Sequence, residues 1–180
     1  ELNDKLWIGR SIRKIGVIYK YKGNNDKALD YYKRALVIAG ELDDKSGIAA
    51  SLYNIGNLYV TKSDYDKALD YNNRSLALDE EVGDKLWVGR GLRKIGNIYY
   101  NKGDKDKALD YYERAVAIAE ELDDKSGVAA SLRDIGMVHA EKGVYDKALD
   151  CFSRSSEISD NIGQKKFVGK DLYKIAIIYD

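Results

Sequence analysis

The chain has 180 residues, with 30 basic and 30 acidic side chains, so its formal net charge is zero when the single histidine is neutral. Apolar residues make up 44% and charged residues 33%, which is too apolar for a disordered chain and too charged for membrane spans. There is no proline and only one cysteine, which favours long helices and excludes an internal disulfide. We therefore expect a helical protein of the cytoplasm with no membrane segment.

An internal repeat organises the chain. The string DKALD recurs at Asp26, Asp66, Asp106 and Asp146, a constant spacing of 40 residues. This spacing predicts a single array over residues 1–180, made of the repeats 1–40, 41–80, 81–120 and 121–160 and the half repeat 161–180. Because the chain stops in the middle of a repeat, we expect it to be a piece of a longer protein.

Each repeat predicts two antiparallel helices. In the first helix of repeat one, Ile8, Ile12 and Ile15 share one face of a 3.6-residue period. In the second helix, Ala28 and Tyr32 begin an equivalent stripe. Glycines and capping aspartates or asparagines separate the two helices, so the connections are short. A single pair cannot bury its apolar faces alone, and the pairs must therefore stack into a solenoid.

Alternate repeats differ at the start of their first helix. Odd repeats carry LWIGR, LWVGR and KFVGK, which contain Trp7, Trp87 and Phe167, whereas even repeats carry Gly47 and Gly127 in SGIAA and SGVAA. We expect the aromatic side chains to pack between repeats, and a ligand-contacting rim is the alternative. The two glycines leave gaps that are either pockets or places of tighter stacking.

The pattern L-x-x-I-G-x-x-Y…A-x-x-x-Y/F-x-x-A resembles the tetratricopeptide repeat over the whole chain. The 40-residue period and the segments SLYNIGNLY and ELDDKSG are similar to the long-repeat subclass of kinesin light chains and Leu-Gly-Asn-repeat adaptors. The resemblance implies an all-α fold, a right-handed superhelix of antiparallel helix pairs. The third repeat matches the family signature throughout, at Leu92, Ile95, Gly96, Tyr99, Ala108, Tyr112 and Ala115.

Three positions depart from that signature. Asn72 replaces the aromatic residue of repeat two, His139 the tyrosine of repeat four, and Ala176 the glycine of the half repeat. We expect these changes to loosen local packing without changing the fold.

The resemblance also implies that the first helix of each repeat lines a concave face where peptides bind. Helical geometry places Arg10 and Arg13 opposite the Ile8 stripe, independently of the family. Arginine suits two-pronged carboxylate recognition, asparagine pairs with a peptide backbone, and tyrosine offers flat contact area. We predict a groove for an acidic or carboxylate-bearing peptide, although an ordinary solvated charged face is the alternative. Its predicted residues are Arg10, Arg13, Tyr53, Asn57, Arg90, Arg93, Asn97, Tyr100, Arg133, Lys170 and Tyr173.

The charges are segregated by helix. The first-helix segments carry 16 basic but only 3 acidic residues, although the whole chain is neutral. This bias predicts a basic inner face and an acidic remainder. The segments counted are residues 5–20, 45–60, 85–100, 125–140 and 165–180.

Other functions are less well supported by the sequence. His139 and Cys151 are the only residues of their kinds, and we expect both to be structural, so we predict no enzyme, no metal site and no cofactor. A self-associating, spacer or regulatory segment of a larger signalling protein is an alternative, because array ends expose apolar faces. Binding of single-stranded nucleic acid to the basic, aromatic face is a weaker alternative, because the net charge is zero.

Overall fold

The computed structural model describes the backbone of residues 2–179 and the side chains of residues 4–178. Every secondary-structure element in this part of the chain is an α-helix, two for each 40-residue repeat, which confirms the predicted all-α repeat fold. No described helix is long and apolar enough to cross a membrane. The helices are α1 (Leu2–Tyr21), α2 (Asn25–Glu41), α3 (Lys45–Thr61), α4 (Tyr65–Glu81), α5 (Lys85–Lys102), α6 (Lys105–Glu121), α7 (Lys125–Glu141), α8 (Tyr145–Asn161) and α9 (Lys165–Tyr179).

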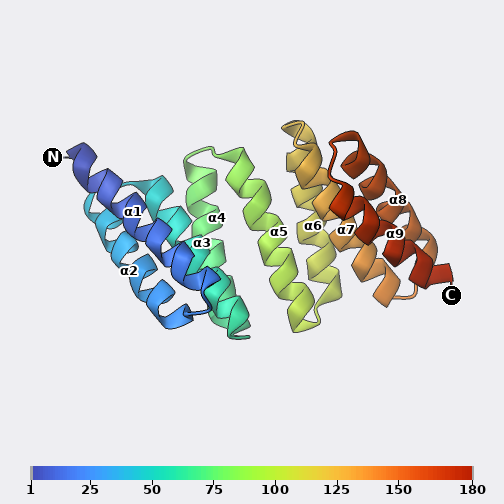
Figure 1. Cartoon of the computed structure of the whole chain (residues 1–180), viewed down its shortest axis with the longest axis horizontal. Helices are drawn as coiled ribbons and strands as arrows, with labels where there is room; N and C mark the ends of the chain where they lie inside the picture. Colours follow the sequence, from blue (N-terminus) through green and yellow to red (C-terminus); the bar gives the residue numbers. More distant parts are fainter. Residues whose placement is uncertain (1, 180) are drawn as a thin grey trace. The chain divides into compact units, whose positions relative to one another are not determined.

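The helices form two compact units, each containing two of the predicted helix pairs. Unit 1 is Glu1–Asp84 and contains α1 to α4, and unit 2 is Lys85–Asp180 and contains α5 to α9. Within each unit, every helix packs against the next one along the chain (Figure 1). In unit 2, the first helices α5 and α7 also contact each other directly. The odd-numbered first helices therefore lie next to one another inside a unit, which brings their side chains within mutual reach.

The turns inside the repeats follow the predicted capping pattern, with two local exceptions. Asn24 caps α2 by accepting a hydrogen bond from the backbone N–H of Lys27 at 3.1 Å. Gly23 has a φ of 76°, the left-handed conformation expected at a helix end. Ser63 adopts the same conformation with a φ of 57°, which is strained for a side chain with a Cβ. Val144 provides no side-chain cap for α8. Both helix ends therefore lack one of the usual stabilising features, the glycine or the side-chain cap.

The core of a helix pair forms where a glycine of the first helix meets a ring of the second. A Cβ at Gly96 would lie 2.6 Å from Cε1 of Tyr112, which is closer than any real contact, and Tyr112 is buried. At Gly136, the ring of Phe152 is similarly close, at 2.8 Å. Glycine at these places therefore leaves room for a large ring of the second helix, which a side chain there would displace.

Candidate functional site

A cavity of about 440 Å³ opens in unit 2 among α5, α7 and α9, the first helices of their repeats. Four of the predicted groove residues line it together, one from α5, one from α7 and two from α9. Their convergence shows that unit 2 alone assembles a basic and aromatic hollow. The lining residues are Arg93, Arg133, Lys170 and Tyr173 from the predicted set, together with Asp134, Met137, Phe167 and Lys174.

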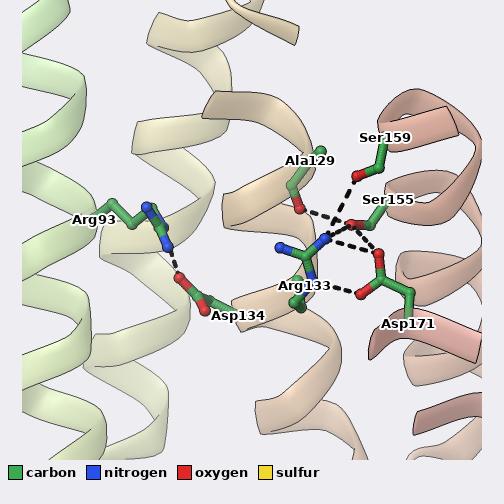
Figure 2. A network of polar contacts seen from close by, with 7 residues as sticks. All are labelled: Arg93, Ala129, Arg133, Asp134, Ser155, Ser159 and Asp171. Carbon is green, nitrogen blue, oxygen red and sulfur yellow. Dashed lines mark hydrogen bonds and ion pairs between the residues drawn. The ribbon is translucent and has the colours of Figure 1, made fainter. Parts of the chain in front are cut away.

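Arg133 of α7 is held inside the wall of this cavity by a buried carboxylate. Its Nη2 lies 2.8 Å from Oδ2 of Asp171, and its Nε donates to the other oxygen of the same group (Figure 2). Asp171 is fully buried, and Ser155 Oγ lies 2.8 Å from its Oδ2. The same Ser155 Oγ is 2.9 Å from the carbonyl oxygen of Ala129. The network joins α7, α8 and α9. The two nitrogens with which Arg133 could bind a ligand carboxylate are therefore already bonded to Asp171 within the protein.

Arg93 of α5 is also engaged by a carboxylate of the next first helix. Its Nε lies 2.7 Å from Oδ2 of Asp134 on α7 (Figure 2). Burial raises the pKa of Asp134 from its ordinary value, and the positive charge of Arg93 opposes this shift. The pair is more open to solvent than the Arg133–Asp171 pair. Arg93 therefore reaches a ligand only in competition with Asp134.

The remaining cations of the cavity belong to α9. Lys170 is exposed and Lys174 is half-buried, and the positive charge of Lys174 contributes to lowering the pKa of Glu141. The Nζ of Lys170 lies 5.4 Å from the centre of the Phe167 ring, and Cζ of Arg133 lies 4.8 Å from that centre. Tyr173 is 66% exposed beside them. Lys170 and Tyr173 are therefore the exposed groups of this cavity, and Phe167 lines it beside them.

Three further predicted residues of unit 2 lie outside the cavity lining. Arg90 is exposed, and its Cζ lies 5.1 Å from the centre of the Trp87 ring. Asn97 accepts a hydrogen bond at 2.7 Å from the hydroxyl of Tyr112. Tyr100 donates to Glu141, and burial together with this bond raises the pKa of Tyr100 to about 12. Arg90 is therefore free for a carboxylate, whereas the Asn97 oxygen is already bound inside the helix pair.

The other four predicted residues belong to unit 1, and the cavity is formed without them. Arg10 is exposed, with its Cζ 6.0 Å from the centre of the Trp7 ring. Arg13 is half-buried, and burial lowers its pKa. Tyr53 is also half-buried, whereas Asn57 is only 7% exposed.

The side-chain oxygen of Asn57 lacks the hydrogen bond that its equivalent in repeat three receives. In repeat three the equivalent Asn97 bonds to Tyr112, but in repeat two Asn72 stands in the place of that tyrosine. Asn72 instead donates to the carbonyl oxygen of Ala68 at 2.8 Å. As a result, the Oδ1 atoms of Asn57 and Asn72 are both buried without a hydrogen-bond partner among the described residues. The departure predicted at Asn72 therefore leaves unsatisfied polar atoms in the core of unit 1.

Asp134 and Asp171 are the important residues that the sequence prediction missed. They are two of only three acidic residues in the basic first-helix segments, and that rarity is the signal that could have identified them. Each lies about one repeat away from its arginine, at a separation of 41 or 38 residues. A single carboxylate placed in a basic row at that separation indicates an ion pair between neighbouring first helices.

The comparisons with known proteins agree with this architecture. Residues 7–81 and 83–162 match the tetratricopeptide repeat family. No curated protein sequence gives a significant match to the chain. The three solved structures described next are 14–18% identical to the chain, so they bear on the fold alone.

Three of these solved structures illustrate the likeness. Aspartyl phosphate phosphatase F from Bacillus subtilis has a TM-score of 0.92 at 18% identity over 97% of this chain and 46% of its own. A Rap protein complexed with competence and sporulation factor has a TM-score of 0.86 at 16% identity, over 97% of this chain and 52% of its own. Kinesin light chain TPR-like repeats from Podospora anserina have a TM-score of 0.77 at 14% identity, over 94% of this chain and 84% of their own.

The chain thus spans about half the length of the first two structures. The family match covers both units and most of the described helices. The chain therefore belongs to the tetratricopeptide repeat family.

Proposed function

We propose that this protein is a non-enzymatic interaction scaffold and that unit 2 binds an acidic peptide segment of a partner protein. The observation that carries this proposal is the cavity among α5, α7 and α9, whose lining includes four basic side chains but only one carboxylate. Because Asp134 and Asp171 engage the two arginines, the charge offered to a ligand comes mainly from Lys170 and Lys174.

The chemistry of these side chains suits a peptide with several carboxylates. Lysine ammonium groups are compact charges on flexible stems, so they follow carboxylates at varied positions, whereas a fixed arginine fork demands one geometry. Tyr173 and Phe167 add flat surface that excludes water from such ion pairs. The Rap protein of similar fold was solved as a complex with competence and sporulation factor, which supports a partner-binding role for this architecture.

Cys151 and His139 belong to residue types that often act in catalysis, but burial shifts the pKa of each away from the value that would favour such a role. Burial raises the pKa of the Cys151 thiol, and a thiol rather than a thiolate is a poor nucleophile. Burial also lowers the pKa of His139. We therefore assign no reaction, cofactor or metal to the chain, and we place its action in the cytoplasm, where a single free thiol is ordinary.

The test is a fluorescence polarisation titration with a labelled peptide of alternating glutamate and alanine, and with its lysine–alanine counterpart. We expect only the acidic peptide to bind. Lys170→Glu with Lys174→Glu should weaken that binding roughly tenfold or more, because two attractive charges become repulsive. Lys165→Glu with Lys166→Glu is the matched control, with the same charge change on the same helix outside the cavity lining. Equal loss in both double variants would refute the proposed site.

Self-association is a second candidate, because α9 exposes apolar side chains. Leu172 is 55% exposed and Ile177 is 50% exposed, although both are large apolar residues of a kind usually buried in a protein core. Light scattering at high protein concentration tests this function, and a strictly monomeric protein would eliminate it. The same polarisation assay with a single-stranded oligonucleotide tests the nucleic-acid alternative, for which we expect no binding.

A further inference from the structure

One carboxylate lies among the basic side chains of the 440 Å³ cavity in unit 2. Asp134 of α7 lines this cavity together with Arg93, Arg133, Lys170 and Lys174. Its side chain is only 16% exposed, and its Oδ2 accepts a hydrogen bond from Nε of Arg93 at 2.7 Å (Figure 2). The protein thus places a carboxylate of its own on an arginine that a ligand carboxylate would use.

The repeat itself does not require a carboxylate at this position. The equivalent residues one repeat before and after Asp134 are Lys94 on α5 and Lys174 on α9. In unit 1 the equivalent residue of α3 is Asn54, whose side chain donates to the carbonyl oxygen of Ala50 at 2.8 Å. Among the five first helices, only α7 has an acidic residue here. The Arg93–Asp134 pair is therefore a local feature of the cavity.

Arg93 is the main support for the ionised form of Asp134. Burial raises the pKa of Asp134, and the charge and hydrogen bond of Arg93 are the largest effects that oppose this rise. The charges of Arg133 and Lys94 oppose it less. Loss of the Arg93 contact should therefore let this half-buried carboxylate bind a proton more readily. The titratable groups that act on Asp134 or line its cavity are Arg93, Lys94 and Tyr100 on α5, Tyr112 on α6, Arg133 on α7, and Lys170 and Lys174 on α9.

We propose that binding of the acidic peptide to unit 2 is coupled to protonation of Asp134, a regulation of this site by pH that rests on the function proposed above. A peptide carboxylate that pairs with Arg93 displaces Asp134 from it. The two carboxylates then repel each other, and Asp134 takes up one proton from solvent. The peptide keeps its charge, because a solvated glutamate has a pKa of about 4.3. Peptide and proton therefore each raise the affinity of the protein for the other.

The test is a polarisation titration with the glutamate–alanine peptide at about pH 7.5 and about pH 5.5. Wild-type affinity should rise roughly fivefold or more as the pH falls, since uptake of one full proton gives at most about tenfold per pH unit. Asp134→Asn should bind more tightly than wild type at the higher pH, because no carboxylate holds Arg93. Its affinity should change little with pH, so the two proteins should converge at the lower pH. Asp134→Ala should behave in the same way.

Asp150→Asn is the matched control, because it removes one negative charge from the exposed Asp150–Arg154 pair on α8 of the same unit. It should keep the affinity and the pH dependence of wild type, and an equal gain in this variant would overturn the coupling. The same pH dependence in wild type and Asp134→Asn, or none in either, would also overturn the coupling but leave the proposed function standing. So would weaker binding by Asp134→Asn at both pH values. No binding by wild type at either pH would overturn the proposed function, and the coupling with it.

Discussion

Replacing Asp171 by alanine should destabilise unit 2 strongly, because it leaves a charge without its partner. The side chain of Arg133 is only 13% exposed and that of Asp171 is not exposed at all. Breaking a buried ion pair by removing one partner costs about 3–5 kcal/mol. That is a large share of the roughly 5–15 kcal/mol by which domains are stable. Asp134→Ala is the matched comparison, because Arg93 is 39% exposed there, and solvent screening should limit the cost to about 1 kcal/mol.

The assay is equilibrium unfolding in urea, followed by the helical circular dichroism signal. Asp171→Ala should lower the midpoint by about 1–2 M for a slope of about 3 kcal/mol per M, the upper end of the range for small proteins. Hydrogen exchange along α9 should rise with it, because Asp171 ties this helix to α7 and α8. Arg133→Met combined with Asp171→Leu should recover most of the loss, since no buried charge remains. A midpoint shift for Asp171→Ala no larger than that for Asp134→Ala would refute this reasoning.

Three further predictions concern unit 1. Asn72→Tyr should raise stability by about 1–2 kcal/mol in thermal unfolding, because the new hydroxyl can donate to Asn57; an unchanged melting temperature would count against it. Ser63→Gly should add about 1 kcal/mol in the same assay by relieving its left-handed φ of 57°, whereas Ser63→Ala should add nothing. Burial raises the pKa of Asp79 to about 6, so its contribution to stability is present when it is protonated and is lost as the pH rises from its unfolded value of 3.8 toward 6. Asp79→Asn should therefore stabilise the protein by about 2–3 kcal/mol near pH 7 and hardly at all near pH 4, and a constant gain across that range in urea unfolding would contradict the assignment.

The periodic features were predictable from sequence because they depend on local spacing. The 40-residue repeat predicted the helix pairs that the structure contains. The convergence of Arg93 and Arg133 on one hollow followed from their equivalent positions on neighbouring first helices. Repeat geometry places such positions on one face, whatever the rest of the chain does.

The ion pairs that Arg93 and Arg133 form with carboxylates of neighbouring helices were not predictable from local spacing. Whether Arg93 faces a ligand or Asp134 depends on side-chain reach between two helices 41 residues apart in sequence. Counting charges over a whole helix conceals such pairs, because one acidic residue hardly changes the total. The same limit applies to Asn57, because the residue that would bond to its side-chain oxygen stands on another helix, where repeat two has Asn72. A difference between equivalent repeats at a contact position is the signal that identifies these cases.

The most direct test of the proposed function is to map the acidic peptide on the protein by backbone amide chemical shifts. Titration with the glutamate–alanine peptide should shift the amides of Lys170, Tyr173 and Lys174 on α9 most strongly. It should leave the outer helices α6 and α8 unchanged along their exposed faces. Saturable shifts centred on α9 would support an acidic-peptide groove in unit 2. Shifts centred on α6 or α8, or none at saturating peptide, would contradict it.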